Sequence, residues 1–258
     1  MRDWLSFWNA PNRIYVNDRH RDVHYRDVAR EIRVLVPVPS ARVLDYGCGE
    51  STSADLVADA AGSLILTDGA AAVRDKLAPR FTDQAKIAVR SPAEVAALAP
   101  GSLDLIVLNS VAQYLKRAEL DELLALFRRL LAPDGRLVVG DVIPPHTSAV
   151  TEIVALMRLA WHNGFVGAAL AGLIRTLFSN YRALRNRLGL SHYTEADMLA
   201  VLAQAGFRAQ RRYPNLEHNQ ERMTFLAVPE GPGVAGGGEV GFEKANKIRA
   251  VFVPGRPR

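Results

Sequence analysis

The segment ARVLDYGCGES, residues 41–51, constrains the fold more than any other part of the chain. Its apolar first half is typical of a buried strand, and Gly47 and Gly49 let the chain turn sharply directly after it. A helix is expected next, because Thr52 and Asp55 have the spacing of a capping box. The order strand, glycine turn, helix opens many α/β folds, so this segment predicts a parallel sheet.

The same alternation of apolar runs and helical patterns continues along the chain. Further strands are expected at residues 63–69, 86–89, 103–110, 136–142, 207–213 and 222–228, and helices near 70–79, 92–98, 118–131 and 194–205. We therefore predict an α/β fold whose sheet is doubly wound, mostly parallel and seven-stranded, with helices on both faces.

The composition indicates a folded domain in a reducing compartment. The chain has 258 residues, 49% of them hydrophobic, which is enough to bury a core of its own. Cys48 is the only cysteine and the N-terminus lacks the apolar core of a signal peptide, so a cytoplasmic location is expected. The net charge of +5 would suit an anionic partner, but the arginine clusters have no interleaved aromatic residues, which makes nucleic acid an unfavoured partner.

Two features near the first strand indicate a bound nucleoside. The glycine turn allows a ligand to approach the backbone closely, and Asp68 follows Gly49 by 19 residues, a spacing that places a carboxylate beside a ribose. A nicotinamide dinucleotide is disfavoured, because the third glycine of its fingerprint would fall on Thr52.

The motifs VLDYGCGES, LTDGA, LDLIVLNSVAQYL and LLAPDGRLVVGD together resemble the successive motifs of the class I S-adenosylmethionine-dependent methyltransferases. The resemblance covers about residues 11–228 and implies the Rossmann-like methyltransferase fold. It also implies a cofactor, S-adenosylmethionine, and a product, S-adenosylhomocysteine. Asp45, Gly47 and Gly49 would line the methionine end of the cofactor, and Asp68 would bind its ribose.

The resemblance extends to other expected contacts with the cofactor. The segment IYVNDRHRDVHYRDVA resembles the helix that closes over the cofactor in many small-molecule members, which brings in Tyr15, Arg19 and Tyr25. Near the adenine the acidic residue common in the family falls on Pro92, so the backbone near Ala93 or the side chains of Ser91 and Glu94 would substitute. The remaining predicted contacts are Cys48, Gly69, Asn109, Ser110 and Tyr114.

We expect the methyltransferase domain to span residues 1–229, with helices in residues 1–35 covering the cofactor. Residues 144–190 are longer than a simple connection needs and are interpreted as a helical lid insertion over the acceptor pocket. Residues 230–258 are rich in glycine, proline and basic residues and are expected to form a flexible tail. In the insertion, one helical face carries Val150, Ile153, Val154, Met157 and Trp161, and the arginines Arg175, Arg182 and Arg185 are expected to point outward or toward an anionic group.

The predicted reaction is in-line transfer of a methyl group to a small, apolar or amphiphilic acceptor. His146 directly follows the fifth strand, at the edge where ligands bind in such sheets, and is the predicted base. No metal is expected, because the histidines are scattered along the sequence. No run is long enough to span a bilayer, although a lipid-linked acceptor and peripheral membrane contact remain open.

Three alternatives compete with this interpretation. The basic charge would also suit a methyltransferase acting on RNA or protein. A protein that binds S-adenosylmethionine without turnover would carry the same motifs. A nicotinamide-dependent oxidoreductase is the third, and the sequence leaves the oligomeric state open.

Overall fold

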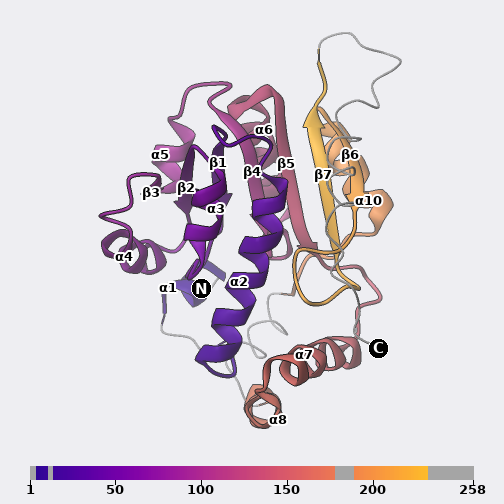
Figure 1. The fold of residues 1–258 in the computed structure, drawn as a ribbon. Helices are drawn as coiled ribbons and strands as arrows, with labels where there is room; N and C mark the ends of the chain where they lie inside the picture. Colours follow the sequence, from indigo (N-terminus) through magenta and orange to yellow (C-terminus); the bar gives the residue numbers. More distant parts are fainter. Residues whose placement is uncertain (1–3, 11–13, 178–188, 232–258) are drawn as a thin grey trace, which may run out of the picture.

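A single seven-stranded sheet organises the molecule (Figure 1). The computed structural model describes residues 4–10, 14–177 and 189–231. The strand order is β3-β2-β1-β4-β5-β7-β6, with β1 to β5 parallel and β7 antiparallel to both β5 and β6. The strands are β1 Arg42–Tyr46, β2 Ser63–Thr67, β3 Ile87–Val89, β4 Leu103–Asn109, β5 Leu131–Val142, β6 Phe207–Arg212 and β7 Met223–Pro229. This confirms the predicted mostly parallel, seven-stranded sheet.

Helices cover both faces of this sheet, as predicted. One face packs against α2 Asp18–Leu35, α3 Ala54–Ala60 and α4 Ala71–Arg80 through a core that includes Ile32, Val57, Leu77 and Val43. The other face packs against α5 Pro92–Ala96, α6 Arg117–Leu130 and α10 Glu195–Gln204 through a core that includes Phe127, Leu124, Met198 and Val139. Full burial of each such side chain contributes about 1.5–3 kcal/mol.

A capping box forms at α10 but not at α3, where one was predicted from Thr52 and Asp55. At α10, Thr194 Oγ1 accepts a hydrogen bond from the backbone N–H of Asp197 at 3.1 Å, and the box is complete. At α3 the prediction was wrong, because the N-cap residue is Ser53 and its side chain makes no capping hydrogen bond. Ser51 adopts a left-handed conformation with φ of 39°, which lengthens the glycine turn and starts the helix later.

The carboxyl ends of the central strands meet at the lower edge in Figure 1, and five segments gather there. They are α1 Trp4–Asn9, the beginning of α2, the short 3₁₀ helix η1 Ala112–Tyr114, and the insertion helices α7 Ala149–Asn163 and α8 Val166–Leu177. In open α/β sheets, ligands bind at this edge.

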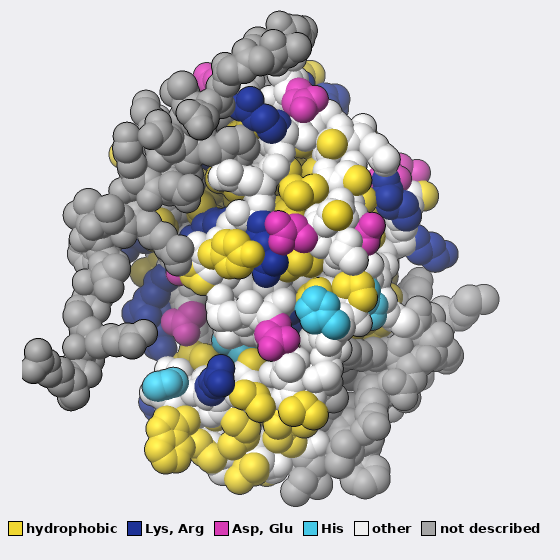
Figure 2. Space-filling view, turned by 90° about the vertical axis from the view of Figure 1, so that its right-hand side faces the viewer, with side chains coloured by type: hydrophobic (Ala, Val, Ile, Leu, Met, Phe, Trp, Pro, Cys, Tyr) yellow, Lys and Arg dark blue, Asp and Glu magenta, His cyan; other side chains and the backbone are white. Residues whose placement is uncertain are grey.

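The insertion is helical, but its packing differs from the expected lid. On α7 the side chains of Val150, Ile153, Val154 and Trp161 are exposed, and Figure 2 shows hydrophobic side chains gathered at this lower end of the molecule. The buried residue of α7 is Ala160, which packs against Phe165 and Ala169 in a small separate cluster, and Met157 of the predicted face is partly buried against it. Most of the predicted apolar face is therefore exposed, and the insertion lines the cavity through Gly172 on α8 and through Gly189 and Leu190.

Some expectations lie outside the described residues. Arg182, Arg185 and residues 232–258 are among them, and α8 is described by its backbone alone at Arg175. Within the described part of the chain, no helix is long and apolar enough to span a membrane.

Candidate functional site

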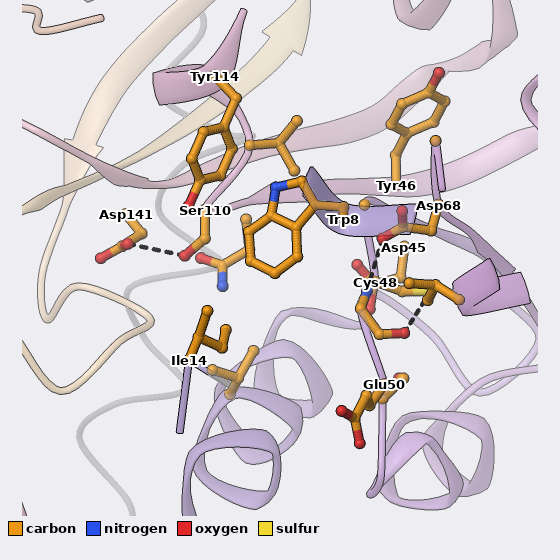
Figure 3. A pocket seen from close by; sticks show the side chains of 18 of the residues that line it. Trp8, Ile14, Asp45, Tyr46, Cys48, Glu50, Asp68, Ser110, Tyr114 and Asp141 are labelled. Atoms are coloured by element: carbon orange, nitrogen blue, oxygen red, sulfur yellow. Dashed lines mark hydrogen bonds between the residues drawn. The ribbon is translucent and has the colours of Figure 1, made fainter. Parts of the chain in front are cut away.

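A large cavity lies at the carboxyl edge of the sheet. Its volume is about 2610 Å³, well above the roughly 300–1,000 Å³ of a pocket for one small ligand, so it has room for two ligands side by side. In Figure 3, the Trp8 indole lies between Asp45, Cys48 and Asp68 on one side and Ser110, Tyr114 and Asp141 on the other. We call the first the glycine end, made of Asp45, Gly47, Cys48, Gly49 and Asp68, and the second the polar end, made of His24, Asn109, Ser110, Asp141 and Glu217.

The glycine end is a turn with little space around its backbone. Gly47 and Gly49 have φ of +82° and +57°, which only glycine adopts readily. A Cβ atom at Gly47 would lie 2.3 Å from a methyl of Val111, and one at Gly49 would lie 2.4 Å from the hydroxyl oxygen of Tyr25. The turn is fixed to β2, because the N–H groups of Gly47 and Cys48 both donate to the Thr67 carbonyl, at 2.8 and 3.0 Å.

Two carboxylates give the glycine end its charge. Asp68 accepts hydrogen bonds from the N–H groups of Gly49 at 3.1 Å and Ala70 at 2.8 Å, and a carboxylate has further lone pairs for a ligand. Burial, together with the nearby Asp68 charge, raises the pKa of Asp45 to about 7. This end of the cavity therefore favours a ligand that carries positive charge and hydroxyl groups.

Aromatic side chains form the wall that separates the two ends. The rings of Trp4 and Trp8 lie 4.6 and 5.7 Å from the ring of Tyr114. The N-terminal helix is also attached on its other side, since Asn9 Oδ1 accepts a hydrogen bond from the N–H of Ala72 at 3.1 Å. Helix α1 thus bridges the cavity between α4 and η1.

The polar end is centred on Glu217, from the loop of residues 213–222 between β6 and β7. Its Oε1 accepts a hydrogen bond from Asn109 Nδ2 at 2.9 Å and lies 3.0 Å from Ser110 Oγ, whose single proton is shared with Asp141 Oδ2 at 2.8 Å. Its Oε2 lies 3.0 Å from Nδ1 of His24, on α2. Burial opposes ionisation of this carboxyl group, but the neighbouring His24 lowers the pKa of Glu217 to about 2, so Glu217 is an anion.

A second buried carboxylate fixes the loop to the sheet. Asp141 pairs with Arg222 and accepts a hydrogen bond from Asn215 Nδ2 at 3.1 Å. Arg222 also reaches Glu152 on α7 at 2.9 Å, so one guanidinium joins β5, the loop and the insertion. The rigid connection means that the position of Glu217 depends on the packing of three separate segments.

Backbone strain is concentrated at this cavity. Among the described residues, the non-glycine positions with positive φ are Ser51, Ser110 and Asp141, and all three line the cavity. Such conformations cost about 1–3 kcal/mol each and are typical of functional sites.

One group of side chains in the described part of the chain has the arrangement of metal ligands. A ligand atom of each of His24, Glu217 and His218 lies within 4.8 Å of the others. We expected no metal because the histidines are scattered along the sequence. The fold brings two of them, His24 and His218, together, so that argument no longer holds. The short contact between His24 and Glu217 equally fits a hydrogen-bonded pair.

Most of the predicted cofactor contacts line this cavity. They are Tyr15, Tyr25, Asp45, Gly47, Cys48, Gly49, Asp68, Gly69, Pro92, Asn109, Ser110 and Tyr114. Burial raises the pKa of the Cys48 thiol, so this side chain is a neutral packing group rather than a nucleophile.

Three predicted residues are not brought into the cavity. Arg19 donates a hydrogen bond to the carbonyl oxygen of Asn163 at the end of α7. Ala93 lies within α5, where Ser91 and Glu94 form a capping box with each other. His146 is exposed, in a turn that follows β5, and does not line the cavity.

Sequence reasoning missed four functional candidates: His24, Asp141, Glu217 and Arg222. Two signals were available. Asp141 interrupts an otherwise apolar strand, β5. The charged segment EHNQER, residues 217–222, follows β6, and β6 runs parallel to β5. Asp141 and this segment therefore lie at the same edge of the sheet.

A family model described as a methyltransferase domain matches residues 18–211. This range includes both ends of the cavity except for the loop that carries Glu217. The chain belongs to the class I S-adenosylmethionine-dependent methyltransferases. None of the curated protein sequences matches this methyltransferase.

Solved structures show the same fold. The Haemonchus contortus phosphoethanolamine N-methyltransferase 1, in complex with phosphoethanolamine and S-adenosylhomocysteine, has a TM-score of 0.58 at 16% identity over 95% of this chain and 51% of that one. The magnesium protoporphyrin IX methyltransferase of Synechocystis PCC 6803, with bound S-adenosylhomocysteine, has a TM-score of 0.55 at 18% identity over 87% and 92%. A chain of the complex of the Haloferax volcanii Trm112 methyltransferase activator with a methyltransferase has a TM-score of 0.58 at 15% identity over 90% and 100%.

The glycine end fits S-adenosylmethionine. Its two glycines allow a tight turn where a Cβ atom would collide with Val111 or Tyr25, Asp68 can accept the ribose hydroxyls, and Asp45 suits a cationic ligand. When bound, S-adenosylmethionine supplies an activated methyl group on a sulfonium. The protein's part is to align an acceptor with that group and to exclude water.

Proposed function

We propose that this methyltransferase acts on a small acceptor that binds in the polar end of the cavity. The observation that carries the proposal is the continuity of the cavity, in which one space of about 2610 Å³ includes both the glycine turn and the polar cluster. A cofactor and a small acceptor can then share the cavity, with the acceptor beside Ser110.

The walls of the cavity support an acceptor with an apolar or aromatic part. Trp4, Trp8 and Tyr114 present ring faces between the two ends, and Tyr15 lies on the polar side, 5.3 Å from the ring of His24. Aromatic faces favour stacking with flat apolar groups, and the polar cluster would fix a single heteroatom.

The charge at the polar end argues against the alternative of an RNA acceptor. Asp141 and Glu217 are both buried there, and a phosphate backbone approaching them would be repelled. The helix α1 across the cavity also restricts access by a folded protein.

The experiment is to incubate the protein with S-adenosylmethionine and fractionated extracts and to measure release of S-adenosylhomocysteine. We expect activity with the fraction of small, protein-free molecules, insensitive to ribonuclease, and mass spectrometry then identifies the methylated product. Activity confined to macromolecular fractions would reject a small acceptor. Binding of S-adenosylmethionine without turnover in any fraction would favour a non-catalytic protein.

A further inference from the structure

The buried contact between His24 and Glu217 is suited to proton transfer. The two side chains are only 16% and 5% exposed, and 3.0 Å separates Nδ1 from Oε2. Asn109 and Ser110 hold the other carboxylate oxygen, so Glu217 cannot rotate freely. A fixed carboxylate at Nδ1 selects one orientation and one tautomer of an imidazole and leaves Nε2 to exchange a proton with a ligand.

The pair also lies where an acceptor would need it. Both residues line the cavity, and Ser110, which contacts Glu217, directly follows β4, the neighbour of the strand that carries the glycine turn. The polar end therefore adjoins the place of the transferable methyl group.

We propose that His24 is the catalytic base of the methyl transfer, oriented by Glu217 as a positioning residue, and that the acceptor carries an O–H or N–H group. This inference rests on the proposed small-molecule function. The acceptor's O–H or N–H bond breaks and its proton passes to Nε2 of His24. The electron pair left on the oxygen or nitrogen forms the new bond to the methyl carbon. The carbon–sulfur bond breaks with its electrons going to sulfur, which becomes a neutral thioether, and His24 later releases the proton to water.

The charges around His24 determine how this step responds to pH. Burial opposes protonation, but the Glu217 carboxylate, and more weakly Asp141, raise the pKa of His24 above its ordinary value. Because only neutral His24 accepts a proton, kcat should rise with pH through that pKa. Loss of the Glu217 charge should lower the pKa of His24 and move the rise to lower pH. Among the described residues, the other titratable groups near His24 are Tyr15, His20, Tyr25, Asp27 and His218, and Arg222 acts on the neighbouring His218.

The test measures kcat from pH 5.5 to 9 at saturating S-adenosylmethionine, so that titration of Asp45 at the glycine end does not contribute. The acceptors are a panel of phenols, aliphatic alcohols and primary amines. We expect His24→Gln to lower kcat about 10²–10⁴-fold and to remove the rise with pH. Glu217→Gln keeps the size and one acceptor oxygen, and should lower kcat less while moving the rise to lower pH. His162→Ala, an exposed histidine of α7 outside the cavity, is the matched control and should behave as wild type.

A second measurement does not depend on the acceptor. Nuclear magnetic resonance titration of the His24 imidazole in the protein with bound S-adenosylhomocysteine should give a lower pKa in Glu217→Gln than in wild type. If wild type methylates no member of the panel, the small-acceptor proposal is contradicted for these classes, and the titration still decides whether Glu217 controls His24. An unchanged titration, or wild-type kcat in a folded His24→Gln variant, overturns the inference. So does activity that EDTA abolishes and Zn²⁺ restores, since His24, Glu217 and His218 would then be metal ligands.

Discussion

The two ends of the cavity are built in different ways. The glycine end comes from residues 45–49 and Asp68, two short segments on neighbouring strands, and backbone hydrogen bonds between these segments hold the turn in place. The polar end takes one side chain each from α2, β5 and the loop between β6 and β7, as well as Asn109 and Ser110. The first end depends on local turn geometry and the second on the packing of distant segments. Substitutions should therefore affect ligand binding at one end and the fold itself at the other.

The largest effect is expected from breaking the buried ion pairs of Arg222. Replacing it by leucine leaves Asp141 and Glu152 without their countercharge and should lower the free energy of unfolding by about 3–5 kcal/mol. Arg30→Leu is the control, because Arg30 pairs with Asp27 on the surface, where such a contact contributes at most about 1 kcal/mol. Urea denaturation measures both. An equal loss of unfolding free energy in the two variants would show that the buried ion pairs of Arg222 do not stabilise the polar end.

The second largest effect is expected on the affinity for S-adenosylmethionine. Asp68→Ala should weaken binding of S-adenosylmethionine by about 1.5–3 kcal/mol, because charge-assisted hydrogen bonds to the ribose are lost. Isothermal titration calorimetry measures the affinity, and thermal melting checks that the turn held by Asp68 survives. Asp75→Ala, an exposed acid of α4, should bind as wild type. Unchanged affinity in a folded Asp68→Ala variant would remove Asp68 from the site.

A smaller effect should follow from pH at the glycine end. With a pKa of about 7, Asp45 is mostly protonated at pH 6 and mostly ionised at pH 7.5, and only the ionised form attracts the cationic methionine end. Raising the pH over this range should strengthen binding about eightfold, the change in the ionised fraction. In Asp45→Asn this dependence should disappear. The same eightfold change in that variant would assign the titration to another group.

The smallest effect is expected at His146, where the sequence-based and structural interpretations differ. Its side chain is exposed outside the cavity, so His146→Ala should keep wild-type turnover and wild-type affinity for S-adenosylmethionine. If the variant instead turned over about a hundredfold more slowly, the sequence-based assignment of the base would be restored. Such a result would also imply that the segment after β5 moves into the cavity during turnover.

The glycine end could be predicted because its chemistry is local. A strand, a tight turn and a carboxylate 19 residues later leave few possible positions for that carboxylate. In the structure, Asp68 accepts a hydrogen bond from the N–H of Gly49. The insertion shows where a local pattern misleads. Its apolar residues do recur at helical spacing, but the spacing cannot say how much of that face is covered. Val150 and Trp161 stay exposed, and Met157 packs against the small cluster of Phe165 and Ala169.

Local sequence patterns were enough to predict the sheet, the helices on its two faces and the glycine turn, because hydrophobic periodicity and glycine conformations act over a few neighbouring residues. The polar end exists only through tertiary contacts. His24 and Glu217 are separated by most of the chain, and their 3.0 Å contact exists only because α2 crosses the same edge of the sheet at which the loop after β6 is fixed by Asp141 and Arg222. A buried carboxylate needs such partners, and no local pattern in a sequence says which distant residue will supply them.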